Sequence, residues 1–217
     1  MTCSSCLAED LTPLILDTSV LINLNACSYG EQILAAIPNE IFVSDFVIRE
    51  LGHETSHSNG ENQFIQNLIT QAIVTVAQLD GNGYAIFEKL ICSPGSLDDG
   101  EAATIAAAAI SGAIPVIDER KGRARTRTLG DVKTAAWSLD LLVHPTVQTK
   151  LPNGEYIAAI YLALRDGRMR IDEERCDAVV KLIGIERALQ CTSLPGFKAR
   201  MKTWKEVVLA SDDTVKL

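Results

Sequence analysis

The chain has 217 residues, of which 47% are hydrophobic and 22% charged, and its formal net charge at pH 7 is −8. These values are typical of a globular protein with one domain of ordinary size, with or without a small appendage. The acidic balance excludes a surface that is basic throughout, but it does not exclude a nuclease, because nucleic-acid binding depends on where charge lies rather than on its sum.

Strand-like and helical patterns alternate through the first two-thirds of the chain. Short apolar or β-branched runs predict strands at residues 14–17, 40–43, 72–79, 113–118 and 132–139. Helical spacing of apolar residues, or high alanine content, predicts helices at residues 19–27, 31–37, 45–51, 62–71, 84–91 and 101–110, with one or two turns in 119–130. This alternation predicts an α/β fold with a parallel sheet that is covered by helices on both faces.

Near Pro152 the sequence pattern changes from alternating strands and helices to helices alone. Residues 154–167 and 174–190 have the apolar stripe of amphipathic helices, and residues 197–217 form a mixed tail that we expect to be partly disordered at its end. We therefore predict a sheet domain over residues 12–150 and a helical C-terminal extension over residues 151–217.

The N-terminal sequence MTCSSCLAED lacks the basic region and apolar core of a signal peptide. No stretch reaches the roughly 18–20 apolar residues that span a bilayer, since Gly112 and Pro115 interrupt the longest one. The six cysteines are scattered, as expected of reduced thiols. We expect a cytoplasmic protein.

A CxxC pair, Cys3 and Cys6, and two histidines at helical spacing, His53 and His57, suggest one alternative for the N-terminal region. Together these four side chains have the composition of a zinc site, but the gap between the pairs is far longer than in compact zinc modules. We therefore favour a frayed N-terminus and a polar loop.

Four acidic residues lie where predicted elements begin or end: Asp17, Glu50, Glu101 and Asp118. Ligands of open parallel sheets collect outside the carboxyl ends of the strands, which is where Asp17 and Asp118 are expected. Carboxylates drawn from distant parts of a chain repel one another unless a cation lies between them. A shared site therefore predicts Mg²⁺ or Mn²⁺, which prefer oxygen ligands, and chemistry on phosphates.

Taken singly, each of these acids also has an ordinary structural explanation. Asp17 and Asp118 have the positions of helix or turn caps, and Glu50 that of a surface helix residue. Asp98 and Glu101 have the spacing of a capping box, in which Glu101 folds back onto the backbone of Asp98. The functional interpretation depends on the convergence of all four acids on one edge of the sheet.

A basic cluster follows directly after Asp118, and its members are Arg120, Lys121, Arg123, Arg125 and Arg127. On a helix, Arg120, Arg123 and Arg127 share one face. A charge run is usually a solvated helix surface. Its position beside an acidic site instead favours contacts with an RNA backbone, because phosphate contacts position a substrate.

The segments DTSVLINL, VIREL and LDDGEAATIAAAAISGAIPVIDERKGR, in this order, resemble a PIN domain. More narrowly they resemble the prokaryotic toxin-type subgroup whose fourth motif reads D-[DE]-R-K-G-R. The similarity covers residues 14–142. It implies a PIN-like three-layer fold related to the 5′ nucleases, with a central, mostly parallel sheet. It also implies an acidic cluster that binds Mg²⁺ or Mn²⁺ and cleaves single-stranded RNA.

Carried over residue by residue, the resemblance implies four catalytic acids: Asp17, Glu50, Glu101 and Asp118. It implies metal ligands among Asp17, Glu101, Asp118 and Glu119, with Asp98 and Asp99 close enough to be outer-shell groups. Many PIN domains have Asp at the third position and Ser or Thr before the last Asp. This chain differs at both places, with Glu101 at the third position and the pair Asp118–Glu119 at the fourth. Because they lie beside Asp17 and Asp118, we expect substrate contacts from Thr18, Ser19, Arg120, Lys121 and Arg123.

The resemblance also implies RNA as substrate, an antitoxin protein as partner if the chain is a toxin, and a homodimer. A second interpretation is a catalytically weak PIN module that binds RNA or a protein partner, and the unusual glutamates at the third and fifth positions motivate it. A third is a phosphatase with Asp17 as nucleophile. Such hydrolases have a second Asp two residues on, where this chain has Ser19, and Lys121 is a weak match for their lysine.

Overall fold

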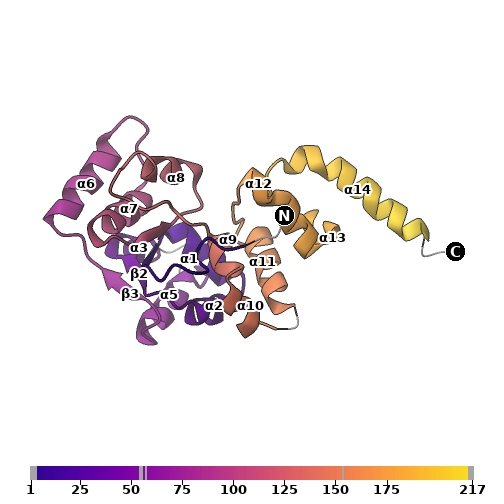
Figure 1. The fold of residues 1–217 in the computed structure, drawn as a ribbon, viewed down its shortest axis with the longest axis horizontal. Coiled ribbons are helices and arrows are strands. Elements are labelled where there is room, and N and C mark those ends of the chain that lie inside the picture. The colour runs from indigo at the N-terminus through magenta and orange to yellow at the C-terminus, as the bar shows by residue number, and fades with distance from the viewer. Residues whose placement is uncertain (1–3, 54–55, 57, 153, 215–217) are drawn as a thin grey trace.

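A four-stranded parallel sheet forms the centre of the structure, a computed structural model that describes residues 4–53, 56, 58–152 and 154–214 (Figure 1). Its spatial order is β3-β2-β1-β4. The strands are β1 (Leu14–Leu16), β2 (Ile41–Ser44), β3 (Thr75–Ala77) and β4 (Ile114–Val116). Every pairing is parallel, and β1 lies between β2 and β4. The carboxyl ends of all four strands therefore meet at one edge.

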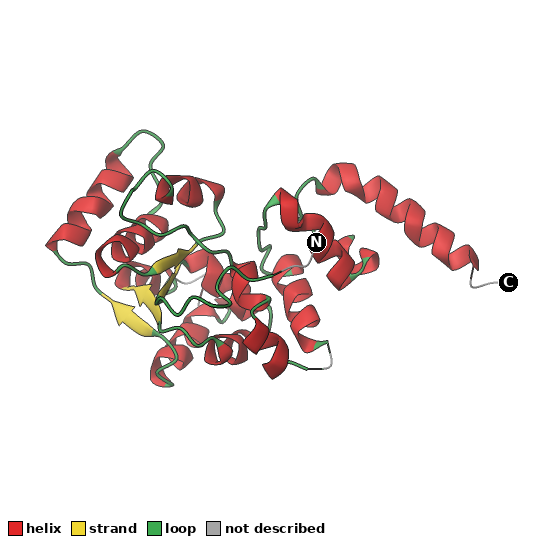
Figure 2. Ribbon diagram, viewed as in Figure 1, coloured by secondary structure: helices red, strands yellow, loops and turns green. Residues whose placement is uncertain are grey.

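Helices cover both faces of this sheet, as Figure 2 shows. Successive strand residues point to opposite faces. Leu14 and Leu16 join the larger apolar cluster, whereas Ile15 joins a second cluster on the other face. The larger cluster includes residues of α1 (Thr18–Ala26), α2 (Gly30–Ala36) and α5 (Glu61–Thr70), and the second is formed largely by α6 (Gly81–Cys92) and α7 (Asp99–Ser111). The predicted three-layer α/β fold is confirmed.

The alanine-rich helix α7 is the most buried helix of the second face. Its residues from Gly100 to Ala108 are all buried, which small side chains permit because they let the helix lie close to the sheet. Asp98 caps its start by accepting a hydrogen bond from the Glu101 N–H at 2.8 Å. The helix ends at Gly112, whose φ of 70° is in the left-handed region that favours glycine.

Short helices begin directly after the strands. The helix α3 (Asp45–Glu50) follows β2, and the Ser44 side chain caps it. The helix α1 follows β1, and Asp17 caps it by accepting a hydrogen bond from the Ser19 N–H. The helix α8 (Arg120–Thr126) follows β4 after Glu119. These sharp strand-to-helix turns hold the helix starts at the carboxyl edge of the sheet.

The strand predicted over residues 132–139 is wrong. The structure has only an isolated parallel bridge there, between Val116 and Ala136. Two hydrogen bonds form it, from the Ala136 N–H to Pro115 and from the Ile117 N–H to Ala136. The pairing stops because α9 (Ser138–Leu142) begins two residues later.

The C-terminal region is helical, as predicted, but two details differ. Gly184, with φ of 88°, divides the helix predicted over residues 174–190. The predicted mixed tail is mostly the helix α14, which extends away from the rest of the molecule in Figure 1, and residues 215–217 lie outside the described part. No helix in the described ranges has the length and apolar character of a membrane span. The helices are α10 (Pro145–Lys150), α11 (Glu155–Arg165), α12 (Glu173–Ile183), α13 (Ile185–Ala188) and α14 (Phe197–Thr214).

One apolar cluster joins the sheet domain to the C-terminal helices. Leu16 and Leu21 belong to the same buried cluster as Ile160 of α11, Val179 of α12 and Trp204 of α14. The two segments therefore share core packing, although the boundary at residue 150 stays a prediction.

The N-terminal segment is packed rather than frayed from Ser4 onward. Leu7 is buried, and the Cys6 N–H donates to the Asp140 carboxylate at 3.2 Å. Arg175 of α12 donates to the same carboxylate at 3.0 Å and to the Ser4 carbonyl at 2.9 Å. Two members of the alternative zinc site, Cys3 and His57, lie outside the described residues.

We expect Asp140→Ala to lower the free energy of unfolding by about 3–5 kcal/mol, because Asp140 is 1% exposed and its loss leaves Arg175 without its buried partner. Urea unfolding measures this. The matched control is Asp166→Ala, which removes an exposed ion pair with Arg165 and should cost at most about 1 kcal/mol. Equal effects of the two variants would contradict a central role for Asp140.

Candidate active site

The sheet topology brings the predicted acids to one edge. Asp17 directly follows β1, and its N–H donates to the Val116 carbonyl of β4 at 3.2 Å. Asp118 lies two residues beyond Val116, and Glu50 is the last residue of α3, which follows β2. Glu101 lies in the first turn of α7, where the Asp17 carboxylate is among the charges that raise its pKa. Helix starts and strand ends therefore place four acids from distant parts of the chain near one another.

Glu50 is held by Thr18 and the start of α7. The Thr18 hydroxyl donates to Glu50 Oε2, and the Gly100 N–H also hydrogen-bonds to this carboxylate. A Cβ on Gly100 would lie 2.4 Å from Glu50 Oε2 and 2.9 Å from Thr18 Oγ1. The position before Glu101 must therefore be glycine for Glu50 to lie where it does.

Glu101 does not behave as a simple capping residue. Asp98 caps the helix as the capping box requires, but the Glu101 side chain is 4% exposed. Its Oε1 is buried and has no hydrogen-bond partner in the described part of the chain. A Cβ on Gly122 of α8 would lie 2.9 Å from this oxygen. Gly122 thus leaves space for the Glu101 carboxylate, as Gly100 does for Glu50. Glu101 Oε1 remains available to bind a ligand.

Burial and mutual repulsion disfavour the charged forms of these acids. The pKa of Asp17 is raised to about 7, chiefly by burial and also by repulsion from Asp98, although hydrogen bonds from Ser19 lower it. Burial raises the pKa of Glu101 to about 7, with added repulsion from Asp98, Asp17 and Glu119. Burial likewise raises the pKa of Glu50. The surrounding protein therefore does not stabilise the charged forms of all these acids at neutral pH.

Asp118 is buried on the side of the edge that faces α1 and α9. Its carboxylate accepts hydrogen bonds from Asn23 Nδ2 at 2.7 Å and from the Ser138 N–H at 2.8 Å. Burial still raises its pKa to about 6, although these bonds and the nearby Arg123 lower it. Asn23 and Ser138 are thus functional neighbours that the sequence patterns did not indicate.

The basic cluster divides into structural and exposed residues. Arg123 is 7% exposed, donates to the Ile117 and Ala136 carbonyls at 3.0 and 2.7 Å, and lies 3.7 Å from the centre of the Trp137 ring. These contacts hold Arg123 in place, and because it also lines the cavity next to Asp118, its predicted substrate contact stays a prediction. Lys121 donates to the Ser96 carbonyl. Arg120 remains exposed beside the acids.

Two cavities adjoin Asp118. One, of about 530 Å³, is lined by Ser19, Asn23, Asp118, Glu119, Arg168 and Arg170, among others. The other, of about 580 Å³, is lined by Asp118, Arg120, Arg127, Trp137 and Arg170, among others. Arg168 and Arg170 were not predicted to lie at this edge. The run of three arginines in RDGRMR was the available signal for them.

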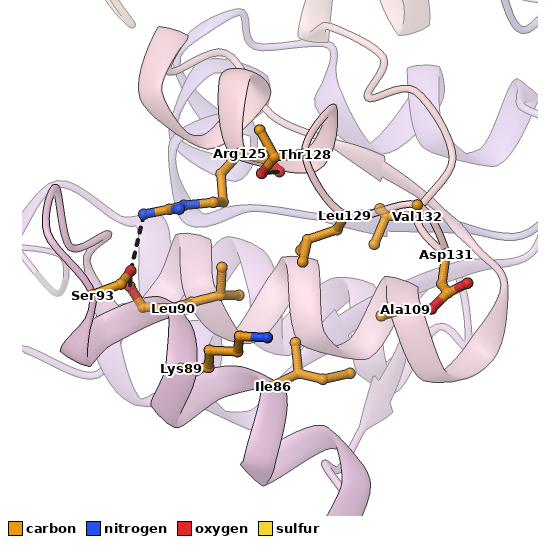
Figure 3. Close-up of a pocket in the computed structure, with 11 residues that line it drawn as sticks. Ile86, Lys89, Leu90, Ser93, Ala109, Arg125, Thr128, Leu129, Asp131 and Val132 are labelled. Carbon is orange, nitrogen blue, oxygen red and sulfur yellow. Dashed lines mark hydrogen bonds between the residues drawn. The ribbon is translucent and has the colours of Figure 1, made fainter.

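A third cavity, of about 420 Å³, lies between α6, α7 and the segment from Arg125 to Val132 (Figure 3). Leu90 and Leu129 contribute apolar lining, and Arg125 donates to the Ser93 hydroxyl at 2.9 Å. None of the predicted acids lines it. The candidate chemistry therefore belongs to the edge of the sheet and not to this cavity.

The donor set at the edge fits a hard divalent cation in charge and chemistry, because carboxylate oxygens are the ligands that Mg²⁺ prefers. The unpartnered Oε1 of Glu101 is the clearest vacant donor. Within the part of the chain that the structure describes, no three acidic, histidine or cysteine side chains approach closely enough to hold an ion together. Binding would therefore require side-chain rotation of the acids.

We expect the stability of the metal-free protein to fall as pH rises. Because the folded pKa of Asp17 is about 7, against an ordinary value of 3.8, the folded state binds this proton more tightly than the unfolded state. The contribution to the free energy of unfolding is complete below about pH 4 and is lost as pH rises through about 7. Thermal unfolding in EDTA, recorded between about pH 5 and 7.5, measures this loss of stability.

The matched variant is Asp17→Asn, whose melting temperature should fall less steeply with pH. One pKa unit corresponds to about 1.4 kcal/mol, so the two curves should diverge by a few degrees over this range. Parallel curves for wild type and variant would contradict the raised pKa.

Comparison with known proteins agrees with this geometry. A family model described as DUF3368, a PIN domain, matches residues 13–185, a range that runs from β1 through α12. No curated protein and no solved structure matches the chain. PIN domains generally have a nuclease-type fold and typically use divalent metals. Because the match covers most of its length, the chain belongs to the PIN domain family.

Proposed function

We propose that this protein is a divalent-metal-dependent endoribonuclease that cleaves phosphodiester bonds of single-stranded RNA. The observation that carries the proposal is the Glu101 carboxylate, which is buried, repelled by Asp17, Asp98 and Glu119, and unpartnered at Oε1. A buried charge without a partner is costly, and coordination of a cation is one of the few ways to compensate it. Membership of a nuclease-type family supports the same assignment.

In this proposal Asp17, Glu101 and Asp118 hold the ion, and Glu119 and Asp99 add negative charge around it. Bound Mg²⁺ or Mn²⁺ supplies a more acidic water and neutralises charge on the phosphate. The residues around the acids contribute by positioning the carboxylates. Asn23 and the Ser138 N–H orient Asp118, whereas the Thr18 hydroxyl and Gly100 N–H orient Glu50. Glu50 would act on the water or the leaving group without directly holding the ion.

Substrate binding would use the exposed cations and the start of α1. Arg120 is exposed in the cavity wall next to Asp118 and would bind a phosphate there. Ser19 lines the neighbouring cavity, and its hydroxyl donates to Asp17 at 2.7 Å. Because the Thr18 hydroxyl is already bound to Glu50, we assign Thr18 a positioning role.

A PIN module that binds RNA without cleaving it is the second candidate. It is favoured by the absence, among residues 4–53, 56, 58–152 and 154–214, of three acids close enough to share an ion. The two proposals differ in one measurement. Tight binding of single-stranded RNA with no product in Mn²⁺ would favour the binding module over the enzyme.

A biological role as the toxin of a toxin–antitoxin pair extends the enzyme proposal. It would require an antitoxin protein as partner, and a homodimer is the oligomer we propose. Growth arrest on expression of the wild type, but not of an inactive variant, would support the role. Light scattering of the purified chain tests the homodimer directly.

We expect Asp17→Asn, Glu101→Gln and Asp118→Asn each to reduce the rate of RNA cleavage by about 10²–10⁴-fold, the range for groups that act at a reacting centre. Cleavage of a labelled single-stranded RNA in Mn²⁺ measures the rate, and EDTA should abolish it. The matched control is Asp177→Asn, which removes the same charge from an exposed surface pair with Arg200.

Cleavage at the wild-type rate by all three folded variants would refute the enzyme proposal. Loss of activity in Asp177→Asn as well would indicate sensitivity to net charge and not to the site. Circular dichroism establishes that each variant is folded.

A further inference from the structure

The loop between α11 and α12, residues 166–172, reaches from the C-terminal helices to the acidic edge. Arg168 and Arg170 line the cavity that contains Ser19 and Asp118. Arg170 also lines the second cavity, as Arg120 does. Both cavities next to the acids are therefore walled in part by residues that come from outside the sheet domain predicted from the sequence.

This loop is held firmly on the residues that position Asp118. A Cβ on Gly167 would lie 2.7 Å from Asn23 Oδ1, so the loop backbone packs directly against the side chain that donates to Asp118. The next turn is anchored by Met169, which is buried and whose N–H donates to the Ala163 carbonyl at 2.9 Å. Ile171 is buried as well. Gly167, Met169 and Ile171 thus anchor the loop. Arg168 and Arg170, which lie between these residues, are exposed.

Two properties of Arg168 bear on its role. Its φ is 58°, a left-handed conformation that Ser28 and Ala72 also adopt shortly after the end of a helix, and glycine would fit it without strain. Its guanidinium has no hydrogen bond or ion pair with any residue that the structure describes. The neighbouring arginines differ, since Arg165 pairs with Asp166 and Arg170 pairs with Glu119. Arg168 is the unpaired cation of this loop.

We propose that Arg168 binds a backbone phosphate of the RNA strand next to the scissile phosphate, so that the C-terminal extension completes the substrate site. This inference rests on the proposed function and adds a binding residue to it. Arginine suits this role because its planar fork donates two hydrogen bonds to a phosphate. With Arg120 and Arg127 on the other side of Asp118, Arg168 would give the strand cationic contacts on both sides of the acids.

Arg170 has a different role from Arg168, because it forms an ion pair with Glu119. Glu119 is one of the carboxylates that repel Glu101. Arg170 compensates that charge from the C-terminal side, and it lies between the two cavities. The unpaired Arg168 is therefore the residue to test.

The test variant is Arg168→Gly in the full chain. Glycine adopts φ of 58° without strain, so the variant removes the guanidinium while the fold is kept or slightly stabilised. Fluorescence anisotropy of a labelled oligouridylate, measured over a range of salt concentrations in the Asp17→Asn background, should show about tenfold weaker binding. The slope of log affinity against log salt should fall by about 0.7, the value for one phosphate contact on a single strand.

Two further variants sharpen the result. Arg168→Lys keeps the charge and should restore the salt slope, but only part of the affinity, because the fork is lost. The matched control is Arg187→Gln, which removes one charge near the Tyr161 ring and away from both cavities. It should leave affinity and slope unchanged. An unchanged salt slope in Arg168→Gly, or an equal loss in Arg187→Gln, would overturn the inference.

Failure of the inference and failure of the proposed function give different results. If the wild type cleaves RNA and Arg168→Gly does so with the same KM, the enzyme proposal stands and the role of Arg168 is rejected. If the wild type does not cleave RNA but binds it, with Arg168→Gly binding more weakly, the enzyme proposal is rejected and Arg168 is kept only as a residue that binds the RNA backbone. For an active enzyme we expect a raised KM with little change in kcat.

Discussion

The structure depends on one constraint: negative charge is held out of water at the carboxyl edge of a parallel sheet. Asp17 and Asp118 are each 3% exposed, and Glu101 is 4% exposed. Burial makes the charged forms of all three unfavourable, and repulsion from neighbouring carboxylates adds to this for Asp17 and Glu101. Neutral side chains at this edge would avoid that cost, so the acids lower the stability of the metal-free protein at neutral pH.

The rest of the molecule supplies the rigidity that this edge requires. Asn23 contacts both the Asp118 carboxylate and the loop at Gly167, so one amide connects the sheet edge to the C-terminal helices. On the far side of those helices, Asp140 joins α9 to α12 and to the N-terminal segment. The shared apolar cluster, which runs from Leu16 to Trp204, underlies both connections. The site is therefore supported by the whole chain and not by the sheet domain alone.

The sequence predicted well what depends on local patterns. Apolar runs with acids at their ends located β1 and β4, and the alanine-rich run located α7. It predicted poorly what depends on tertiary contacts. Among five basic residues after Asp118, nothing local shows that Arg123 is the one whose guanidinium is buried between two carbonyls. The β-prone residues near Ala136 form only a bridge, because Asp118 accepts from Ser138 and the chain turns into α9. The position of Arg168 beside Asp118 was not predicted, because nothing local in the sequence shows that the buried residues Met169 and Ile171 place its loop there.

The two glycines that flank the acids have a consequence of their own. At Gly100 and Gly122 a single methyl group would intrude on the carboxylates of Glu50 and Glu101. An alanine at either place would therefore force a carboxylate into another position, even in a chain that kept every acid of the motif. When related chains are compared, these two positions show whether the acids can lie as they do here.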